Sequence, residues 1–282
     1  MLVDRVRPRG PYSLALSARL VGDATRRFRD GVFDARVASG RGVAWQQPDG
    51  IVCLRATSED ALARLRFVLA IDDDHTPFVL RFRDDPLLGR TIRHLRGLRP
   101  VRLASVAHAL LRALCGQLID ARTARELERT IVRKATERIE GLNVPPTCAD
   151  LARFSPAELR KLGLHARRGA TLARVCRSLE LEELRAQPTD AVAARLERER
   201  GIGPWSVGVV CLEGLGRFER GLEGDLGLVK LLATMRGRPV ESWETAELLE
   251  PYGEWAGLAS VYLLHGYARG LLPLPARPRR AA

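Results

Sequence analysis

Apolar and polar residues alternate through the first part of the chain, in short runs that end at turn-forming residues. The runs are YSLALSARL from Tyr12, VFDARVAS from Val32, GVAWQQ from Gly42 and IVCLRATS from Ile51. Alternation bounded by glycine and by a Pro48-Asp49-Gly50 turn is typical of antiparallel hairpins. Ser58 then precedes an amphipathic run that we expect to be a capped helix lying on the sheet. Residues 1–74 are therefore predicted to form a small α+β domain of sheet plus helix.

The pattern becomes helical after Asp72-Asp73-Asp74-His75, and no further strand is expected. Residues 103–119 are apolar on most faces, which is typical of a buried central helix, and residues 120–139 form an amphipathic pattern rich in Arg and Glu. The segment GLNVPPT at residues 141–147 breaks the helical pattern. The predicted fold class is thus α+β, an N-terminal antiparallel sheet with helices followed by an all-α domain over residues 75–270.

The start of one later helix is written plainly in the sequence. Ser155-Pro156-Ala157-Glu158 is a capping box, with an N-cap serine, proline at the first helical position and a glutamate that reaches back to the cap. Further helices are expected over Leu172–Leu184 and from Thr189. Residues 271–282 are rich in proline and arginine, and we expect this tail to be disordered.

The chain of 282 residues is strongly basic, with a formal net charge of +12. A basic surface favours a polyanionic partner, and nucleic acid is the first candidate. However, only Lys134, Lys161 and Lys230 are lysines and the other 43 basic residues are arginine, which is also typical of codon bias in a GC-rich genome. Charge alone leaves both interpretations open, so a motif must decide.

The five cysteines are scattered, without a CxxC pair or a cluster. This spacing argues against a disulfide framework, a structural zinc site and an iron–sulfur cluster, and favours buried free thiols. The triplet Asp72-Asp73-Asp74 could bind a metal, but its place after an apolar helix end favours the start of the next helix or loop. No run of 18 apolar residues occurs. We expect a soluble, cytoplasmic, nucleoid-associated protein without a cofactor.

The stretch from Thr189 to Lys230 carries the candidate chemistry. A turn, Gly201-Ile202-Gly203-Pro204, separates two helical patterns, which excludes a dinucleotide-binding turn because that turn follows a strand and needs a third glycine. Backbone N–H groups at the start of the second helix would suit a phosphate oxygen, although a purely structural corner between two helices stays open. Asp225 then opens another helix, where it is a helix cap, a catalytic carboxylate or both.

These residues resemble the helix-hairpin-helix DNA glycosylases. GIGPWSVGVV followed by GDLGLVK is similar to the signature of that superfamily, and specifically to its alkylation-repair branch, 3-methyladenine DNA glycosylase II. The resemblance continues in LLRALCGQLIDARTA, SPAELRKLGLHARRGATL and EWAGLASVYLLHGYARG, which match the central helix and flanking helices of the family. Because the branch also carries an N-terminal α+β layer, the resemblance covers essentially the whole chain.

The resemblance implies a role for several residues. Asp225 matches the catalytic aspartate, while Gly201, Gly203 and Ser206 match the hairpin that binds a DNA phosphate, in some relatives through a monovalent cation at residues 201–206. Leu118 matches the leucine that fills the gap left by a flipped nucleotide, and the preceding Gln117 is placed to touch the opposite strand. The residues implied to line the base pocket are Trp205, Val209, Leu226 and Tyr267.

The chain also departs from the family pattern. Trp205 stands where relatives with lyase activity have a lysine nucleophile, so the resemblance implies a monofunctional enzyme. Val209 and Gly266 stand where some members have aromatic residues, which predicts a less aromatic pocket. Trp205 and Tyr267 could instead be ordinary core aromatics, and His265 is expected to be a core histidine rather than a base.

Chemistry then favours an alkylated substrate. Glycosidic hydrolysis usually takes two carboxyl groups, one of which protonates the leaving group. A purine alkylated at N3 or N7 is already positive and can leave without that acid, so one carboxylate suffices. The sequence therefore predicts a monomeric enzyme acting on double-stranded DNA with alkylated bases such as 3-methyladenine. The alternative is a non-catalytic protein of the same fold that binds damaged DNA; a regulator that reads DNA with a recognition helix fits less well.

Overall fold

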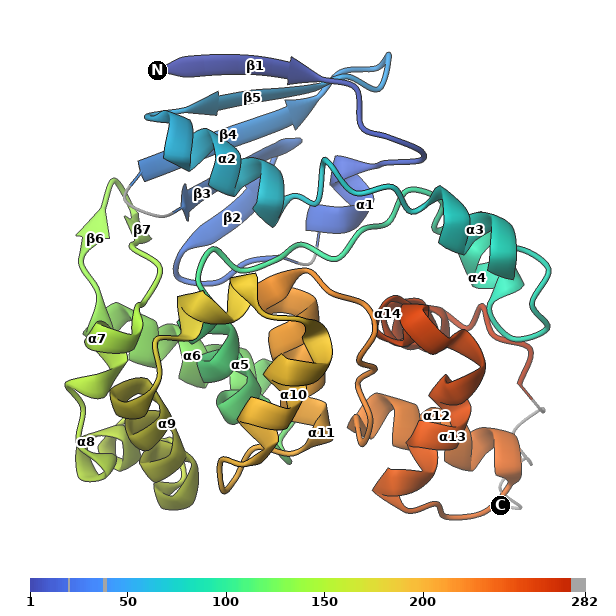
Figure 1. Ribbon diagram of the computed structural model, residues 1–282. Helices are drawn as coiled ribbons and strands as arrows, with labels where there is room; N and C mark the ends of the chain where they lie inside the picture. Colours follow the sequence, from blue (N-terminus) through green and yellow to red (C-terminus); the bar gives the residue numbers. More distant parts are fainter. Residues whose placement is uncertain (20, 38–39, 275–282) are drawn as a thin grey trace, which may run out of the picture.

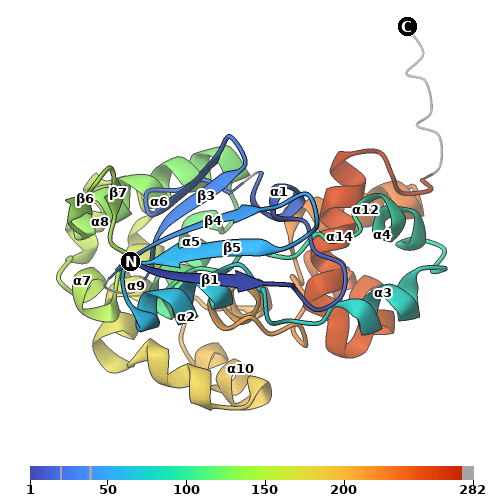
Figure 2. The same cartoon turned by 90° about the horizontal axis from the view of Figure 1, so that it is seen from above.

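The computed structural model of the protein describes residues 1–19, 21–37 and 40–274, and it has an α+β fold (Figure 1). A five-stranded antiparallel sheet lies at one end of the molecule and helices form the rest (Figure 1). Seen from above, the sheet covers the helices with one face, and its outer face is not covered by another layer (Figure 2).

The sheet has the strand order β1-β5-β4-β3-β2. Its strands are β1 (Leu2–Val6), β2 (Arg26–Arg29), β3 (Val32–Val37), β4 (Gly40–Gln46) and β5 (Val52–Ala56). Helix α2 (Glu59–Val68) packs on the inner face, and Ser58 caps it by accepting a hydrogen bond from the Ala61 N–H, as predicted. The approach is close because Gly42 has no side chain: a Cβ there would lie 2.9 Å from Leu65.

Three details of this layer differ from the sequence prediction. The run from Tyr12 does not form a strand but contains the short helix α1 (Leu14–Ala18), which Ser13 caps. Leu14, Ser17 and Ala18 are buried together at helical spacing, and this outweighs the alternation. Strands β1 and β2 were not predicted. Each is short, and β2 is mostly arginine, so pairing with β5 and β3 rather than a local pattern defines them.

Beyond the layer the chain is mostly helical, and the helices form two groups below the sheet (Figure 1). The larger group is built around α5, and the smaller joins the C-terminal helices to two earlier ones, α3 and α4. The bounds of the helices are α3 (Thr76–Phe82), α4 (Gly89–His94), α5 (Val106–Gly116), α6 (Ala121–Ala135), α7 (Cys148–Ala152), α8 (Pro156–Lys161), α9 (Ala166–Ser178), α10 (Thr189–Glu197), α11 (Pro204–Val209), α12 (Leu226–Arg236), α13 (Thr245–Leu249) and α14 (Ala256–Ala268). Shorter 3-10 and π segments, η1 (Leu181–Ala186), η2 (Val210–Leu215), η3 (Ser242–Glu244) and η4 (Glu250–Trp255), connect them.

The expectation of an all-α region after residue 74 is wrong at one place. Strands β6 (Arg138–Ile139) and β7 (Leu142–Asn143) form a small hairpin after α6, which therefore ends at Ala135 rather than at Ile139. Contacts with the large sheet region hold it there: Asn143 N–H donates to Ala24 O at 2.8 Å, and Arg41 Nη1 lies 2.7 Å from Glu140 Oε2. Two-residue strands carry too little pattern to be predicted.

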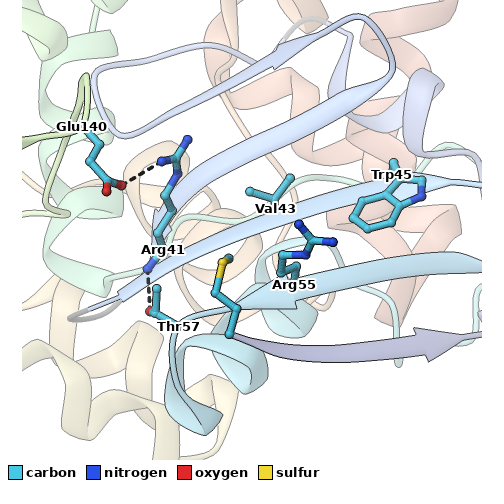
Figure 3. Close-up of a pocket in the computed structure, with 7 residues that line it drawn as sticks. Arg41, Val43, Trp45, Arg55, Thr57 and Glu140 are labelled. Carbon is cyan, nitrogen blue, oxygen red and sulfur yellow. Dashed lines mark hydrogen bonds and ion pairs between the residues drawn. The ribbon is translucent and has the colours of Figure 1, made fainter.

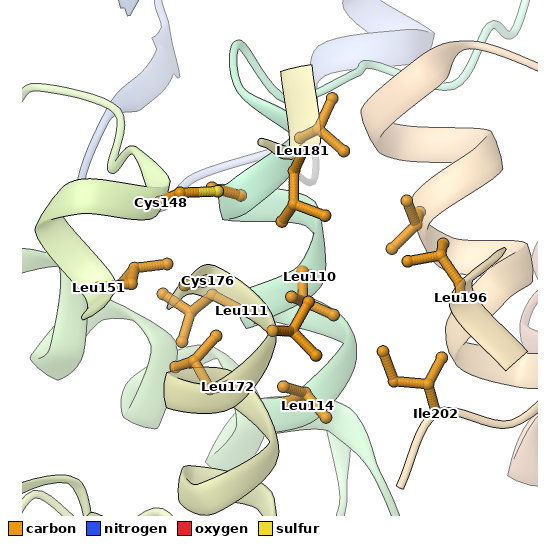
Figure 4. Packing of buried hydrophobic residues seen from close by; sticks show 14 of the residues in the cluster. Leu110, Leu111, Leu114, Cys148, Leu151, Leu172, Cys176, Leu181, Leu196 and Ile202 are labelled. Carbon is orange, nitrogen blue, oxygen red and sulfur yellow. The ribbon is translucent and has the colours of Figure 1, made fainter. Parts of the chain in front are cut away.

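Helix α5 forms the centre of the larger group, as its apolar composition predicts. Leu110, Leu111 and Leu114 on α5 pack against residues of α7, α9 and α10 (Figure 4). Helices α3, α4 and α12 to α14 share a second core with Ala113 of α5, and a third lies between the sheet and α2. All five cysteines are buried and free, which confirms that prediction.

The starts of two helices and the C-terminal tail can also be compared with the sequence prediction. Ser155 and Glu158 make the predicted capping box at the start of α8. The helix expected over Leu172–Leu184 instead starts at Ala166 and ends at Ser178, with η1 after it. The predicted disorder is wrong for residues 271–274, where Leu272 is buried; residues 275–282 lie outside the described residues. Within the described part of the chain, none of the helices is long and apolar enough to cross a membrane.

Candidate functional site

Helices α10 and α11 and the turn between them form the predicted hairpin, on the side of the molecule away from the sheet (Figure 1). The turn needs glycine at residue 201, where φ is +96° and a Cβ would lie 2.5 Å from Thr171 Oγ1. Thr171 also donates to Arg200 O at 3.0 Å, and Arg174 Nη2 donates to the same oxygen at 2.7 Å. Helix α9 thus fixes the shape of the turn.

Gly203 has a different environment from Gly201. It is the N-cap of α11 with an ordinary extended backbone, and a Cβ there would meet no atom within 4 Å. Pro204 follows at the first helical position, and α11 continues directly into η2. The first-turn N–H groups of such a helix lack intrahelical acceptors and favour an anion. The space at Gly203 lets an anionic group approach these donors.

Asp225 is the N-cap of α12, and both of its carboxylate oxygens are hydrogen-bonded. Oδ1 accepts from the Gly227 N–H at 2.7 Å, as expected of a helix cap. Oδ2 accepts from the indole Nε1–H of Trp205 at 3.0 Å. No ion pair among residues 1–19, 21–37 and 40–274 includes Asp225, so the partners of the carboxylate are neutral donors. A half-buried anion is therefore held beside the hairpin.

Gln117 and Leu118 bring the end of α5 to the same hairpin. Gln117 Nε2 donates to Gly201 O at 2.9 Å and to Ser206 Oγ at 3.0 Å, and Ser206 is itself buried. Leu118 has a φ of +56°, which is rare for leucine, and 85% of its surface is exposed. The structure thus unites Gln117, Gly201, Ser206, Trp205 and Asp225, with Leu118 projecting from the end of α5.

The residues expected in a base pocket are less closely grouped. Leu226, next to Asp225, is 44% exposed, whereas Val209 is 5% exposed and belongs to the core shared with α12 and α14. Tyr267 on α14 is half-buried, and its hydroxyl lies 3.4 Å from Thr234 Oγ1, well along α12 from its start. The hydrogen bonds of the described residues do not link Tyr267 with Asp225.

Gly266 does not face this site. A Cβ at Gly266 would lie 2.3 Å from Thr91 Oγ1 and 2.8 Å from Leu272, so the position faces α4 and the C-terminal segment. Close helix packing explains the glycine. The sequence interpretation assumed that Gly266 makes the pocket less aromatic, but the residue does not line the pocket. His265 is half-buried, and burial followed by the nearby Arg269 lowers the pKa of its imidazole.

Some features of the site were not found from the sequence. The last residue of α5, Gly116, lies under the Trp205 ring, because a Cβ there would come within 2.7 Å of Trp205 Cη2. Arg198 and Arg200 are exposed on the turn, where they can add positive charge. A glycine at the end of an apolar helix could have suggested close packing, but its partner lies about 90 residues away in the chain and cannot be predicted from spacing.

The carboxylates of two other acidic clusters pair with side chains or backbone groups of the protein. Asp72 pairs with Arg66, Asp73 with Arg102, and Asp74 Oδ1 accepts from the Thr76 N–H at 2.9 Å, so the acidic triplet is used in separate contacts. A second cluster, Asp23, His108 and Glu128, has metal-like spacing. Arg112 reaches Asp23 and Glu128 at 2.8 Å each, and thus supplies the positive charge that a metal ion would bring.

A pocket on the outer face of the sheet is also remote from the hairpin (Figure 3). Trp45, Val43 and Arg55 line it, and an ion pair between Arg41 and Glu140 closes one side. None of its residues belongs to the group around Asp225.

Comparisons with known proteins confirm the resemblance found in the sequence: the chain is similar in sequence to a DNA-3-methyladenine glycosylase, and its fold is similar to that of solved DNA glycosylases. No family model matches the chain. The DNA-3-methyladenine glycosylase of Bacillus subtilis (strain 168) is 29% identical over 206 residues, which cover 68% of this chain and 67% of that protein.

Two solved structures show the same fold. The 3-methyladenine DNA-glycosylase from Archaeoglobus fulgidus has a TM-score of 0.81 at 19% identity, with 94% of this chain and 98% of that chain covered. An 8-oxoguanine glycosylase/lyase from Clostridium acetobutylicum, in complex with double-stranded DNA, has a TM-score of 0.75 at 16% identity, with 96% and 98% covered. The same fold thus occurs in enzymes that act on different damaged bases. The fold alone therefore does not identify the substrate, which has to be inferred from the residues of the site.

Proposed function

We propose that this protein is a DNA glycosylase that flips alkylated purines, such as 3-methyladenine, out of duplex DNA and hydrolyses the N-glycosidic bond. The observation that carries the proposal is the Asp225 carboxylate, bonded to Gly227 N–H at 2.7 Å and to Trp205 Nε1–H at 3.0 Å beside the hairpin. The sequence similarity to a DNA-3-methyladenine glycosylase supports the choice of alkylated bases.

The carboxylate would act on the sugar rather than on the base. As the glycosidic bond breaks, positive charge develops on the deoxyribose, and a fixed anion stabilises that charge. The carboxylate lies at the start of α12, where its oxygen accepts a hydrogen bond from a backbone N–H of the helix and is held in place. An alkylated purine already carries positive charge and leaves without a protein acid, so Asp225 needs no second carboxyl partner. Water then completes the hydrolysis at the sugar carbon.

The hairpin would position the DNA. The open space at Gly203, the first-turn N–H groups of α11 and the exposed Arg198 and Arg200 support binding of a backbone phosphate. Gly201 O accepts one hydrogen bond from Gln117 and keeps a second lone pair, so turn carbonyls could also hold the monovalent cation that the resemblance implies. Such a cation would neutralise phosphate charge.

Base flipping would use the end of α5. Leu118 is exposed and projects from the same helix end that contacts the hairpin, which supports its role in filling the gap left by the nucleotide. Trp205, Leu226 and Tyr267 would border the flipped base, with Val209 beneath them, since aromatic faces suit a cationic base. We also propose that Gln117 reaches the opposite strand once its bonds to the turn rearrange.

Trp205 in the place of a lysine supports a monofunctional enzyme, because an indole cannot form a Schiff base. We therefore propose hydrolysis without strand cleavage. We also propose that the protein acts as a monomer on chromosomal DNA in the cytoplasm. We propose further that the chain forms two domains, which meet between residues 74 and 75, and that the first serves as a scaffold.

Base release from methylated duplex DNA tests the proposal. We expect free 3-methyladenine, abasic sites that break only on later treatment with alkali, and little release from a matched duplex containing 8-oxoguanine. Strand breaks before alkali treatment would contradict the monofunctional assignment. Tight binding of damaged DNA with no release from any alkylated substrate would instead favour a non-catalytic damage-binding protein.

A further inference from the structure

We propose that Trp205 is a positioning residue that holds the Asp225 carboxylate in place through its indole N–H, and that it thereby joins the carboxylate to the hairpin and to the end of α5. The inference rests on the proposed function, in which Asp225 stabilises the sugar cation. Trp205 would then position the carboxylate in addition to offering an aromatic surface to the base.

The two oxygens of Asp225 are held by different parts of the chain. Oδ1 is bonded within its own helix, to the Gly227 N–H at 2.7 Å. Oδ2 is bonded to Trp205 Nε1 at 3.0 Å, and Trp205 belongs to α11, 20 residues earlier in the chain. A helix cap alone leaves the carboxylate free to turn about its side-chain bonds, whereas a second donor from another helix fixes its plane.

The indole is itself held in a defined place. Trp205 is the second residue of α11, directly after Pro204, so its backbone is fixed at the hairpin. Its ring lies against Gly116, where an added Cβ would approach Cη2 to 2.7 Å, and no other residue type leaves that space. The ring therefore fits between the end of α5 and the start of α12. Its edge, and not its face, meets Asp225.

Gln117 makes a second link at the same junction. It follows Gly116, and its Nε2 donates to Gly201 O at 2.9 Å and to Ser206 Oγ at 3.0 Å. The end of α5 thus contacts the hairpin through Gln117 and through the Trp205 ring. Leu118 is the next residue, so the proposed wedge, the proposed phosphate site and the carboxylate are joined within one network. DNA that moves the hairpin would also move the carboxylate.

A variant that changes only the N–H separates positioning from packing. Site-specific replacement of Trp205 by 3-benzothienylalanine keeps the shape of the two rings but puts sulfur in place of the N–H. Trp205→Phe is the simpler variant, and Trp243→Phe, at a side chain that is 66% exposed, is the control. We expect the single-turnover rate of 3-methyladenine release to fall about 10-fold in both Trp205 variants, with DNA affinity nearly unchanged. An unchanged rate with benzothienylalanine would overturn the proposal.

A second variant moves the indole without altering it. Gly116→Ala would push the ring away from α5 and displace the N–H from Oδ2, so base release should slow in the same way. Gly22→Ala is the matched control, because a Cβ there meets only Arg129, at 3.9 Å. A Gly116→Ala protein that folds normally and keeps the wild-type rate would contradict the role of the ring position.

An NMR measurement tests the contact independently of activity. In a ¹H–¹⁵N spectrum, the indole signal of Trp205 should shift upfield in Asp225→Ala, while that of Trp243 stays in place. An unmoved Trp205 signal would overturn the inference whatever the activity. A shifted signal in a protein that releases no alkylated base would leave the contact standing but remove the proposed function, and the positioning role with it.

Discussion

At the scale of single residues, Leu118 has both a strained backbone conformation and an exposed side chain. Its φ of +56° lies in the left-handed region, which costs a residue with a side chain about 1–2 kcal/mol, and its side chain is 85% exposed. A glycine would avoid the cost, and an exposed leucine gains little from burial in the free protein. Strained residues of this kind cluster at functional sites. Both features support the proposal that the Leu118 side chain acts on DNA.

Leu118→Ala and Leu118→Gly should separate function from stability. Both remove the wedge, so both should weaken binding to a duplex with an abasic-site analogue more than binding to undamaged DNA. Only glycine relieves the backbone, and it should raise the free energy of unfolding by up to about 1 kcal/mol in urea titrations. Leu80→Gly, at an exposed leucine in α3, should instead lower it by about 1 kcal/mol. Equal losses of specific and nonspecific binding would contradict the wedge role.

The sequence pointed to these residues as candidates but could not predict their contacts. Asp225, Gly201 and Leu118 stand in local patterns, and hydrogen bonds of Gln117 and Trp205 bring their segments together. The Trp205–Asp225 hydrogen bond and the Gly116 contact join segments far apart in the chain, and no local pattern encodes them. Gly266 was interpreted as a pocket residue because its neighbours resemble the family, but its packing against Thr91 depends on α4.

At the scale of elements, the two glycines of the hairpin have separate duties. Gly201 needs its positive φ and its lack of a side chain against Thr171, so it determines the turn. Gly203 has ordinary backbone angles and open space, so the folded chain alone does not require glycine there. The simplest reason for a glycine at that position is the approach of a ligand to the backbone.

Alanine at each glycine should therefore have a different effect. Gly201→Ala should lower the free energy of unfolding by on the order of 1–3 kcal/mol, because of backbone strain and the clash with Thr171. Gly203→Ala should lower it by less than about 1 kcal/mol, yet weaken DNA binding about 10-fold by blocking the phosphate. Urea unfolding and fluorescence anisotropy with a labelled duplex measure the two effects. Wild-type affinity in Gly203→Ala would place the phosphate elsewhere.

Secondary-structure prediction failed for elements that depend on strand pairing and not on a local sequence pattern. Helices with capping signals, such as those after Ser58 and Ser155, were predicted at their starts. Strands β6 and β7 have two residues each and exist through contacts with one another and with the large sheet. In α1, the burial of Leu14, Ser17 and Ala18 at helical spacing, together with the Ser13 cap, outweighed an alternating pattern. Local signals thus defined helix starts, while short strands needed the tertiary structure.

At the scale of the whole molecule, buried charges join the sheet layer to the helices. Arg112 on α5 contacts Asp23 before β2, Glu128 on α6 and Glu213 in η2, and Arg26 adds a second cation at Asp23. Burial alone would raise the pKa of Glu128, but Arg112 and His108 outweigh it and lower that pKa to about 2. The pKa of Asp23 is also lowered, since Arg26 and Arg112 outweigh its burial. The proposed boundary at residue 74 is therefore bridged by ion pairs.

The network predicts how stability depends on pH. A carboxyl group whose pKa is lower in the folded state contributes stability above its unfolded pKa and loses it as the pH falls. The free energy of unfolding should thus fall as the pH drops from about 4.5 towards about 2, the range between the ordinary and the folded pKa of Glu128.

Glu128→Gln should reduce this pH dependence and cost about 3 kcal/mol at neutral pH, because Arg112 loses a buried partner. Glu126→Gln, at an exposed residue two positions away on the same helix, is the control and should change neither the pH dependence nor the free energy of unfolding at neutral pH. Urea unfolding between pH 5.5 and pH 2.5 measures both effects. The same slope in Glu128→Gln as in the wild type would contradict the role of the network.

The rate of base release in Asp225→Asn tests the central claim most directly. Asparagine also caps helices well, and its one carbonyl oxygen can still accept from the Gly227 N–H, while an NH2 group replaces the oxygen that accepts from Trp205. The substitution therefore removes the charge and keeps the helix cap. Asp150→Asn, at a carboxylate in the capping box of α7, is the matched control. We predict that Asp225→Asn lowers the single-turnover release of 3-methyladenine at least 100-fold with DNA binding nearly unchanged, and that the control keeps the wild-type rate. Undiminished release by Asp225→Asn would contradict the account.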